Sequence, residues 1–568
     1  MPATEFPRRF VASDAVLDDF ARIEPYFDDL RDRDIDEVAA LECWLLDASE
    51  LAACLSEQRT ERYVRMTCQT DDEALAQRYL HFVEEVDPPC RKRWHELNVK
   101  YAASPAAVEL PQPRYFVMDR STRAAVELFR EENIPLLVDQ TRLCQEYQKI
   151  CGQMTVEFEG AERTLPEMAV YLENTDRSVR ERAWTLTAQR RLADRDKLEA
   201  LFDGLRDVRR RIARNADLPD FRAYAFRGYQ RFDYTPEDCL RFHEAIERTA
   251  VPAARELNAR RQSALAVESL RPWDLSVDEQ GREGLRPFAD VTALCDGCGE
   301  IFRRVDPELA EQFADMRARE CLDLASRKGK APGGYQSTFD EARRPFIFMN
   351  AVGLHRDLET LLHEGGHAFH AYATRGEDLY EYRGAPIEFA EVASMAMELL
   401  AMDHFDVFYD GDDLARAKRK QLEGILKLFP WAATIDAFQH WLYTHPQHTA
   451  DERRAYWLEL QERFGGGVDY TGHESALAFA WHRQLHIFEV PFYYIEYAIA
   501  QLGALQVWQN AKRDRAEAVR AYRHALGLGG SRPLPELFAA AGIRFDFSED
   551  TLAPLIDAVR AALADLPD

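Results

Sequence analysis

Hydrophobic positions recur mainly at three- and four-residue spacing along this chain, which is the pattern of amphipathic helices. Over residues 30–64 they recur without a glycine or proline, and over 176–214 the pattern passes a single breaker, Gly204. The second stretch is long enough to need tertiary support, either as a pair of helices or as one long helix. Further helices are predicted near residues 236–258, 356–374, 388–405, 414–429, 451–463 and 492–512.

Helix breakers cluster in three places. Residues 104–113 read as a linker or an exposed loop, and residues 266–290 look irregular. A glycine-rich stretch at 327–335 precedes the apolar run Phe-Ile-Phe-Met at 346–349, which is the best strand candidate in the chain. The pattern therefore predicts a mostly α protein with little β structure. At 568 residues the chain is too long for one simple domain.

Charge and hydropathy exclude several classes of function. The formal net charge is −27, so we expect a soluble protein that repels nucleic acid. The basic runs at 209–211 and 418–420 lie in helical stretches and read as solvated helix faces. No window approaches about 18 uninterrupted apolar residues, so no membrane partner is expected.

The start of the sequence and its cysteines indicate a cytoplasmic location. The first residues lack the apolar core of a signal peptide. The ten cysteines are scattered, as expected of reduced thiols. Cys295 and Cys298 form the one CxxC pair, and they read as ordinary thiols because no second pair completes a zinc site.

Residues 363–367 read His-Glu-Gly-Gly-His, an HExxH pattern. In a helix, positions i and i+4 share a face, so His363 and His367 can reach one cation. Glu364 projects about 100° away and can accept a proton from water without binding the metal. Leu358, Leu361 and Leu362 give this helix its buried stripe. The two glycines oppose helix formation and suggest tight packing or close approach of another backbone.

A catalytic zinc site needs a third protein ligand, commonly a carboxylate. Glu391 stands 24 residues after His367 and Glu388 stands 21 residues after it, on one face of a second predicted helix. Spacing alone does not separate the two. The metzincin pattern fails because position 373 is Ala rather than His, and His370 reads as a packing or supporting residue.

A second cluster of polar-tipped side chains lies more than a hundred residues downstream in an apolar stretch. It contains His486, Tyr493, Tyr494 and Tyr497. Imidazole N–H and phenol O–H groups can stabilise the oxyanion that forms during amide hydrolysis. Aromatic side chains at this spacing are also common in protein cores, so spacing leaves both interpretations open.

Taken together, these motifs resemble the oligoendopeptidase F and thimet oligopeptidase group of zinc peptidases. Residues 363–370 look like the family's HExGHxxH, and residues 389–394, Phe-Ala-Glu-Val-Ala-Ser, look like the segment of its third ligand. The resemblance selects Glu391 over Glu388 and implies that His486, Tyr494 and Tyr497 hold the oxyanion. Ala390 departs from the Val common in the family, and Tyr493 and Tyr494 can exchange roles.

The resemblance implies a two-lobed helical zincin-type peptidase with a deep substrate channel and a small β-sheet next to the metal helix. We expect an N-terminal helical lobe at 1–175 and a catalytic region at 176–568, with interleaved lobes. It further implies one Zn²⁺ per chain, endopeptidase action on short peptides, and pairing of substrate with the strand at 346–350. The alternatives are an exopeptidase of the dipeptidyl carboxypeptidase kind and an inactive helical peptide-binding protein. The oligomeric state is not predicted.

Overall fold

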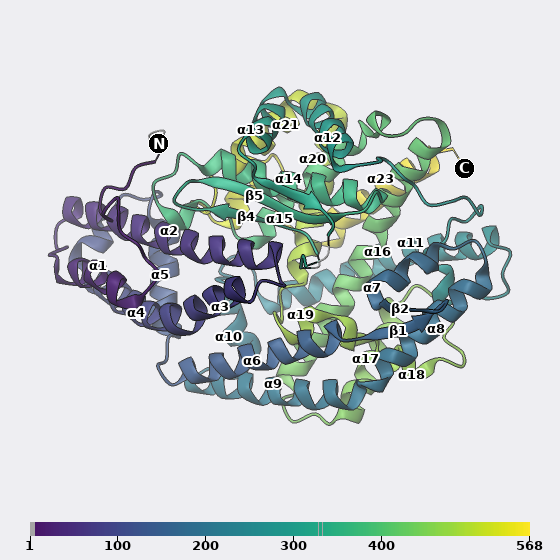
Figure 1. The fold of residues 1–568 in the computed structure, drawn as a ribbon, viewed down its shortest axis with the longest axis horizontal. Helices are drawn as coiled ribbons and strands as arrows, with labels where there is room; N and C mark the ends of the chain where they lie inside the picture. The colour runs from purple at the N-terminus through teal and green to yellow at the C-terminus, as the bar shows by residue number, and fades with distance from the viewer. Residues whose placement is uncertain (1–5, 328, 332, 568) are drawn as a thin grey trace. The chain divides into compact units, whose positions relative to one another are not determined.

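A computed structural model describes residues 6–327, 329–331 and 333–567, and most of the chain is helical (Figure 1). Two compact units are each assembled from three segments. Unit 1 comprises Met1–Phe129, Arg286–Lys418 and Ala500–Phe545, and unit 2 comprises Arg130–Leu285, Arg419–Ile499 and Asp546–Asp568. The predicted mostly α class with a small sheet is confirmed, whereas the boundary at 175/176 stays a prediction.

Unit 1 holds the one three-stranded sheet among the described residues. The helices of unit 1 are α1 (Phe20–Asp32), α2 (Val38–Cys68), α3 (Glu73–His81), α4 (Asp87–Ala103), α5 (Phe116–Leu128), α12 (Val291–Val305), α13 (Pro307–Ala318), α14 (His355–Thr374), α15 (Ile387–Met402), α21 (Arg515–Gly527) and α22 (Leu534–Ala540). The strands are β3 (Leu322–Ala325), β4 (Tyr335–Phe339) and β5 (Arg344–Ala351). Helices α14 and α2 pack against this sheet.

Unit 2 is built almost entirely of helices with one β-hairpin. Its elements are α6 (Asn133–Gly152), β1 (Thr155–Phe158), β2 (Ala161–Thr164), α7 (Leu165–Met168), α8 (Arg177–Ala193), α9 (Arg195–Asn215), α10 (Phe221–Gly228), α11 (Pro236–Ala264), α17 (Ala450–Phe464), α18 (Glu474–Ala478), α19 (Leu485–Phe488) and α23 (Glu549–Ala564). Two of the boundaries between the units fall inside helices, namely α16 (Gly411–Thr444) and α20 (Ile495–Arg513). Each of these helices therefore belongs partly to unit 1 and partly to unit 2.

The three-stranded sheet has the order β3-β5-β4, with β3 parallel and β4 antiparallel to β5. Ile347 pairs with Leu322 on one side and with Gln336 on the other. The strand predicted at 346–349 is therefore confirmed as part of β5. The prediction that it pairs with substrate is wrong, because both of its edges are already occupied. The edge strands are β3 and β4.

Two predicted helical stretches are interrupted in the structure. The stretch at 30–64 contains a break, because α1 ends at Asp32 and α2 begins at Val38. Asp34 accepts a hydrogen bond from the amide of Asp36 in that break, which is a local alternative to helix. The stretch at 176–214 is a helix pair, divided at Asp194 between α8 and α9.

Two predictions of exposure hold only in part. Residues 105–109 form a 3₁₀ helix inside unit 1, so the stretch at 104–113 is not a linker between the units. Ala106, Ala107 and Leu110 are buried, whereas Val108 and residues 111–113 are exposed. Arg209 is fully buried rather than solvated, donating to the Tyr443 hydroxyl at 2.7 Å and to the Phe488 carbonyl. A buried guanidinium requires such acceptors because an unpaired buried charge is costly.

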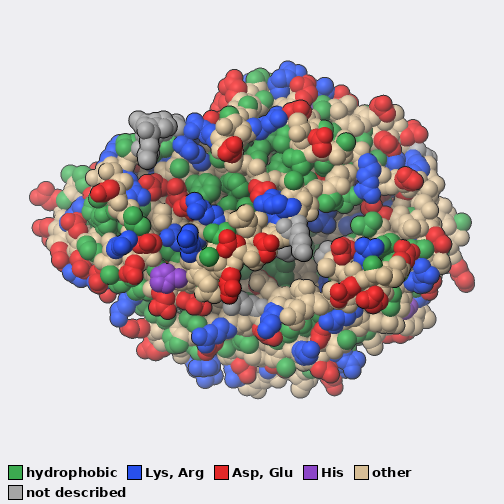
Figure 2. Space-filling view, viewed as in Figure 1, with side chains coloured by type: hydrophobic (Ala, Val, Ile, Leu, Met, Phe, Trp, Pro, Cys, Tyr) green, Lys and Arg blue, Asp and Glu red, His purple; other side chains and the backbone are tan. Residues whose placement is uncertain are grey.

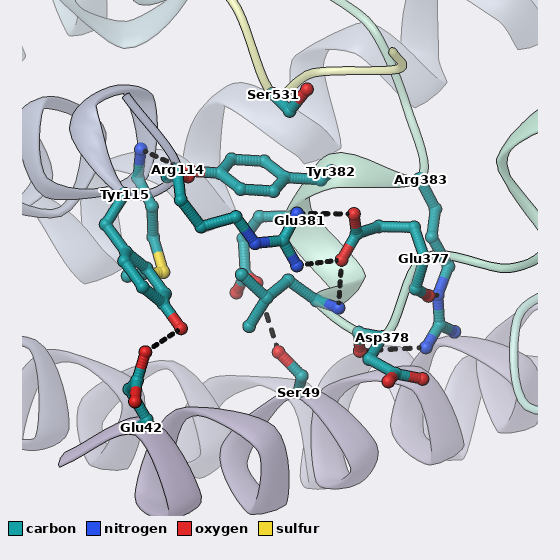
Figure 3. A network of polar contacts seen from close by, with 12 residues as sticks. Glu42, Ser49, Arg114, Tyr115, Glu377, Asp378, Glu381, Tyr382, Arg383 and Ser531 are labelled. Carbon is teal, nitrogen blue, oxygen red and sulfur yellow. Dashed lines mark hydrogen bonds and ion pairs between the residues drawn. The ribbon is translucent and has the colours of Figure 1, made fainter. Parts of the chain in front are cut away.

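A polar network joins the N-terminal helices of unit 1 to the segment that follows α14 (Figure 3). Arg114 makes a two-pronged ion pair with Glu377, with both nitrogen–oxygen distances at 2.6 Å. The Tyr382 hydroxyl donates to the Arg114 carbonyl at 2.8 Å, and Ser49 of α2 donates to Glu381 at 3.4 Å. These contacts hold the segment that follows α14 against α2 and the start of α5.

The surface carries both signs of charge. On the face shown in Figure 2, acidic and basic side chains are interspersed. Many of them pair one helical turn apart, as Arg33 does with Asp29. None of the described helices combines the length and the apolar character that crossing a membrane requires.

Candidate metal centre

The metal motif lies on α14, which packs directly on α15 in unit 1. Leu358, Leu361 and Leu362 are fully buried, as the leucine stripe predicts. Asp357 fixes the start of α14 by accepting hydrogen bonds from the amides of Val352 and Leu354, at 2.8 and 2.9 Å. This anchoring places the HExxH residues two turns into a well-defined helix.

The two glycines of the motif allow close packing on two sides. A Cβ on Gly366 would lie 2.6 Å from both the Ala393 carbonyl oxygen and Ser394 Cα of α15. A Cβ on Gly365 would lie 2.7 Å from the ring of Phe302. The expected close approach of another backbone is confirmed at Gly366. Only a glycine lets the two ligand-bearing helices come this near.

Three donor atoms converge between these helices. The side chains of His363, His367 and Glu391 each offer one atom within 4.8 Å of the others. Glu391 Oε2 lies 3.4 Å from His363 Nε2 and 3.7 Å from His367 Nε2. Ligands bound at about 2.0–2.2 Å in a tetrahedral site lie about 3.3–3.6 Å apart. The spacing therefore fits a divalent metal.

Hydrogen bonds from neighbouring residues orient two of these donors. Glu398 Oε1 lies 2.7 Å from His363 Nδ1, which directs Nε2 of that ring toward Glu391. Ser394 donates to Glu391 Oε2 at 2.9 Å. Sequence reasoning missed Glu398, although its place seven residues after Glu391 on a helix puts both on one face.

The charge balance of the group favours a cation. Burial opposes ionisation of Glu391, but His363 and His367 prevail and lower its pKa to about 2. Burial also works to lower the pKa of His363, but Glu391 and Glu398 raise it well above its ordinary value. An ionised carboxylate next to two imidazoles is a donor set that a divalent cation can occupy, with release of any ligand proton on binding.

Glu364 is buried beside this group and is not one of the three converging donors. Burial, with a smaller contribution from Glu391, raises the pKa of Glu364 to about 7, while His363 and the backbone amide of Gln336 oppose the rise. Gln336 belongs to β4, so the carboxylate lies at this edge strand. A carboxylate in this position can accept and return a proton.

Two other candidate residues lie outside the donor group. Glu388 is buried in the first turn of α15, but the converging carboxylate among the described residues is Glu391. His370 is buried on α14, where burial lowers its pKa to about 4.

The downstream aromatic cluster lies in unit 2. The ring of His486 is 4.8 Å from that of Tyr494 and 5.8 Å from that of Tyr497, between centroids, and Tyr493 lies 5.5 Å from Tyr497. The amide of Gln484 donates to His486 Nδ1 at 2.6 Å, which leaves the proton of the neutral ring on Nε2. His486 is then an N–H donor, although the role of this cluster toward a substrate stays a prediction.

Arg231 fixes the backbone that presents these tyrosines. It is buried and pairs with Glu496 at 2.7 Å, and it also donates to the carbonyl of Phe492. Glu496 lies in the first turn of α20, next to Tyr497. This ion pair escaped the sequence reading because its partners are 265 residues apart.

Comparison with known proteins identifies relatives of this architecture. The sequence profile of peptidase family M3 matches residues 170–555. A 3.1 Å X-ray structure of a protein provisionally named oligoendopeptidase F is 28% identical, with a TM-score of 0.91 over 98% of this chain and 99% of that one. A structure of PZ peptidase A with an inhibitor is 26% identical, with the same TM-score and coverage.

Curated relatives match over shorter stretches. Oligopeptidase PepF of Bacillus subtilis is 26% identical over 41% of this chain and 36% of its own length. Group B oligopeptidase PepB of Streptococcus agalactiae is 24% identical over 50% of this chain and 47% of its own length. The matched region thus spans about a third to a half of these two relatives.

Proposed function

Because the chain belongs to peptidase family M3, we propose that it is a zinc-dependent endopeptidase that hydrolyses short peptides. The observation that carries the proposal is the convergence of His363, His367 and Glu391 beside the buried Glu364. Two imidazoles and one carboxylate are the donor set of catalytic zinc sites, which keep a further position open. The names of the related oligopeptidases support peptides as the substrate class.

Glu364 is assigned as the general base. When bound, zinc polarises the scissile carbonyl and makes water a stronger acid. Glu364 accepts the proton of the attacking water and later delivers it to the leaving amine. Its buried position beside β4 keeps bulk water from competing for this proton. Glu398 and Ser394 keep the metal-binding atoms in their orientations through the hydrogen bonds described above.

Tyr497, with His486 or Tyr494, is assigned to the oxyanion. The hydrogen bond from Gln484 supports this role because it leaves His486 Nε2 as a donor. Tyr497→Phe is expected to lower kcat about a hundredfold with a smaller effect on KM, because the donor acts in the transition state. A loss confined to KM would instead make Tyr497 a substrate-binding residue.

The edge strand β4 is the proposed binding site for the substrate backbone. Among the described strands it pairs only with β5, so one of its edges has no strand partner. An extended peptide can add to such an edge through backbone hydrogen bonds, largely without regard to its sequence. The contact of Glu364 with Gln336 would then bring a peptide bound along β4 close to the general base.

The test is digestion of an end-blocked peptide of about ten residues, with and without a chelator, followed by mass spectrometry. Internal cleavage that chelation abolishes and zinc restores is the expected result. Cleavage only of peptides with a free end would favour an exopeptidase. Zinc binding without cleavage of either peptide would favour a peptide-binding protein.

A matched pair of variants tests the third ligand. Glu391→Gln removes a ligand charge, so we expect loss of zinc and of activity. Glu388→Gln changes a carboxylate that is equally buried on the same helix but lies outside the donor group, so zinc content is expected to stay at the wild-type level. The reverse result would transfer the ligand role to Glu388.

A further inference from the structure

A second set of metal-binding side chains lies in the core of unit 2. Cys239 and His243 are one helical turn apart on α11, and Asp436 and His440 are one turn apart on α16. Each pair has the i, i+4 spacing that puts two side chains on one helix face. The two helices therefore each present two donor residues.

Three of these side chains converge on one point. Cys239, Asp436 and His440 each offer one donor atom within 4.8 Å of the others. His440 Nε2 lies 3.2 Å from Asp436 Oδ2, close to the separation of two ligands on one zinc ion. The approach is not aligned as a hydrogen bond, and this ring nitrogen has no hydrogen-bond partner among the described residues. Such geometry fits a lone pair directed at a third atom.

His243 supports the carboxylate of this group. Its Nε2 lies 2.8 Å from Asp436 Oδ2, within hydrogen-bonding distance. The other oxygen, Oδ1, is buried and has no hydrogen-bond partner in the described part of the chain. A buried carboxylate oxygen without a partner is costly, and a cation would satisfy it. An imidazole that holds a metal-binding carboxylate is a usual second layer of a metal site.

The surroundings favour a group whose charges cancel. All four residues are buried, and the rings of Phe226, Phe464 and Phe492 pack against the two histidines. A divalent cation, one thiolate, one carboxylate and neutral imidazole sum to zero charge, which an apolar core tolerates.

The competing arrangement is a hydrogen-bonded cluster without metal. In it, both imidazoles would donate to Asp436 and Arg222 would donate to His440 Nδ1. The contact with Arg222 is 3.4 Å long, at the weak limit of a hydrogen bond. This arrangement also leaves Asp436 Oδ1 without a hydrogen-bond partner in the described part of the chain.

The geometry points to a zinc-class site in which Cys239, Asp436 and His440 bind the ion and His243 holds Asp436. A mixed sulfur, nitrogen and oxygen donor set suits a borderline-soft divalent ion such as Zn²⁺. Binding releases the Cys239 thiol proton, and the sulfur donates an electron pair to the cation. The ion would link α11 to α16 and is independent of the site on α14.

Cobalt substitution of the full chain tests this site separately from the proposed catalytic one. Only a cysteine-containing site gives a near-ultraviolet thiolate-to-cobalt charge-transfer band, because the donor set on α14 has no sulfur. We expect about two metal ions per chain in the wild type, with the band present. His367→Ala should lose one ion and keep the band.

Cys239→Ser is expected to abolish the band and lose one ion, whereas Cys298→Ser is the matched control. Both cysteines are fully buried on helices, but only Cys239 lies in the donor group. If Cys239→Ser does not fold, the wild-type spectrum and the His367→Ala variant still decide the question. A wild-type protein with one ion and no band would overturn the proposal, and so would a band that persists in folded Cys239→Ser.

Discussion

Replacing Gly366 by alanine tests whether helix spacing sets the metal site. The added Cβ would lie 2.6 Å from backbone atoms of Ala393 and Ser394, whereas ordinary contact begins at 3.4 Å. The helices must therefore separate by about 0.8 Å, the difference between those distances. Metal–ligand bonds tolerate deviations of only about 0.2 Å, so Glu391 can no longer reach an ion held by both histidines without strain.

We expect Gly366→Ala to weaken zinc affinity by at least about tenfold, comparable to losing a supporting contact of the site. Overpacking against backbone costs about 2–3 kcal/mol, and the higher helix propensity of alanine returns about 1 kcal/mol, so unfolding becomes about 1–2 kcal/mol easier. The assay is competition for zinc with a chromogenic chelator, together with peptide cleavage at limiting zinc.

Gly424→Ala is the matched control for Gly366→Ala. Gly424 also lies inside a helix, α16, but an added Cβ would meet no atom within 4 Å. It should leave zinc affinity unchanged and stabilise the protein by about 0.5–1 kcal/mol. Wild-type zinc affinity in Gly366→Ala would refute the argument that close packing of α14 on α15 sets the ligand geometry.

Three further predictions follow from individual contacts. Glu398→Gln should weaken zinc affinity about 10–100-fold, measured by chelator competition, because His363 loses its orienting carboxylate. Arg231→Met should lower the free energy of unfolding, measured by denaturant titration, by about 3–5 kcal/mol, because it removes the cation that pairs with buried Glu496. Burial opposes ionisation of Asp274, but Arg177 and Arg180 prevail and lower its pKa. The ionised carboxylate therefore stabilises the folded protein above about pH 4, and this contribution is lost as the pH falls further. Asp274→Asn should therefore flatten the acid limb of stability against pH. Unchanged zinc affinity in Glu398→Gln would contradict the first prediction. An unchanged free energy of unfolding in Arg231→Met would contradict the second, and an unchanged acid limb in Asp274→Asn would contradict the third.

The metal helix and the family were predictable because both follow from local spacing. The i, i+4 histidines define one face of the metal helix, and the buried leucine stripe defines another. The matched family profile confirms the predicted resemblance to oligoendopeptidase F-like M3 peptidases. Glu398 obeys the same helical rule and was within reach of the sequence. The donors on α11 and α16 also have this spacing, but only the fold brings their two helices together.

Long-range pairing was not predictable from the pattern. The apolar run at 346–349 indicates a strand, but a single sequence does not fix the order of strands, so its central position in the sheet was missed. The helix pair at 176–214 was one of two expected arrangements, but the position of its break at Asp194 was not predicted, because the residue is neither glycine nor proline. Its carboxylate instead pairs with Arg190 and Lys197 at the junction of α8 and α9.

The central claim is that Glu364 activates water beside a zinc ion held by His363, His367 and Glu391. The most direct test measures zinc content and kcat of Glu364→Gln next to Glu359→Gln, which changes another carboxylate on α14 outside the donor group. We predict that both variants keep zinc, that Glu359→Gln keeps its activity, and that Glu364→Gln loses at least about a hundredfold in kcat. Cleavage by zinc-loaded Glu364→Gln at the wild-type rate would contradict the account.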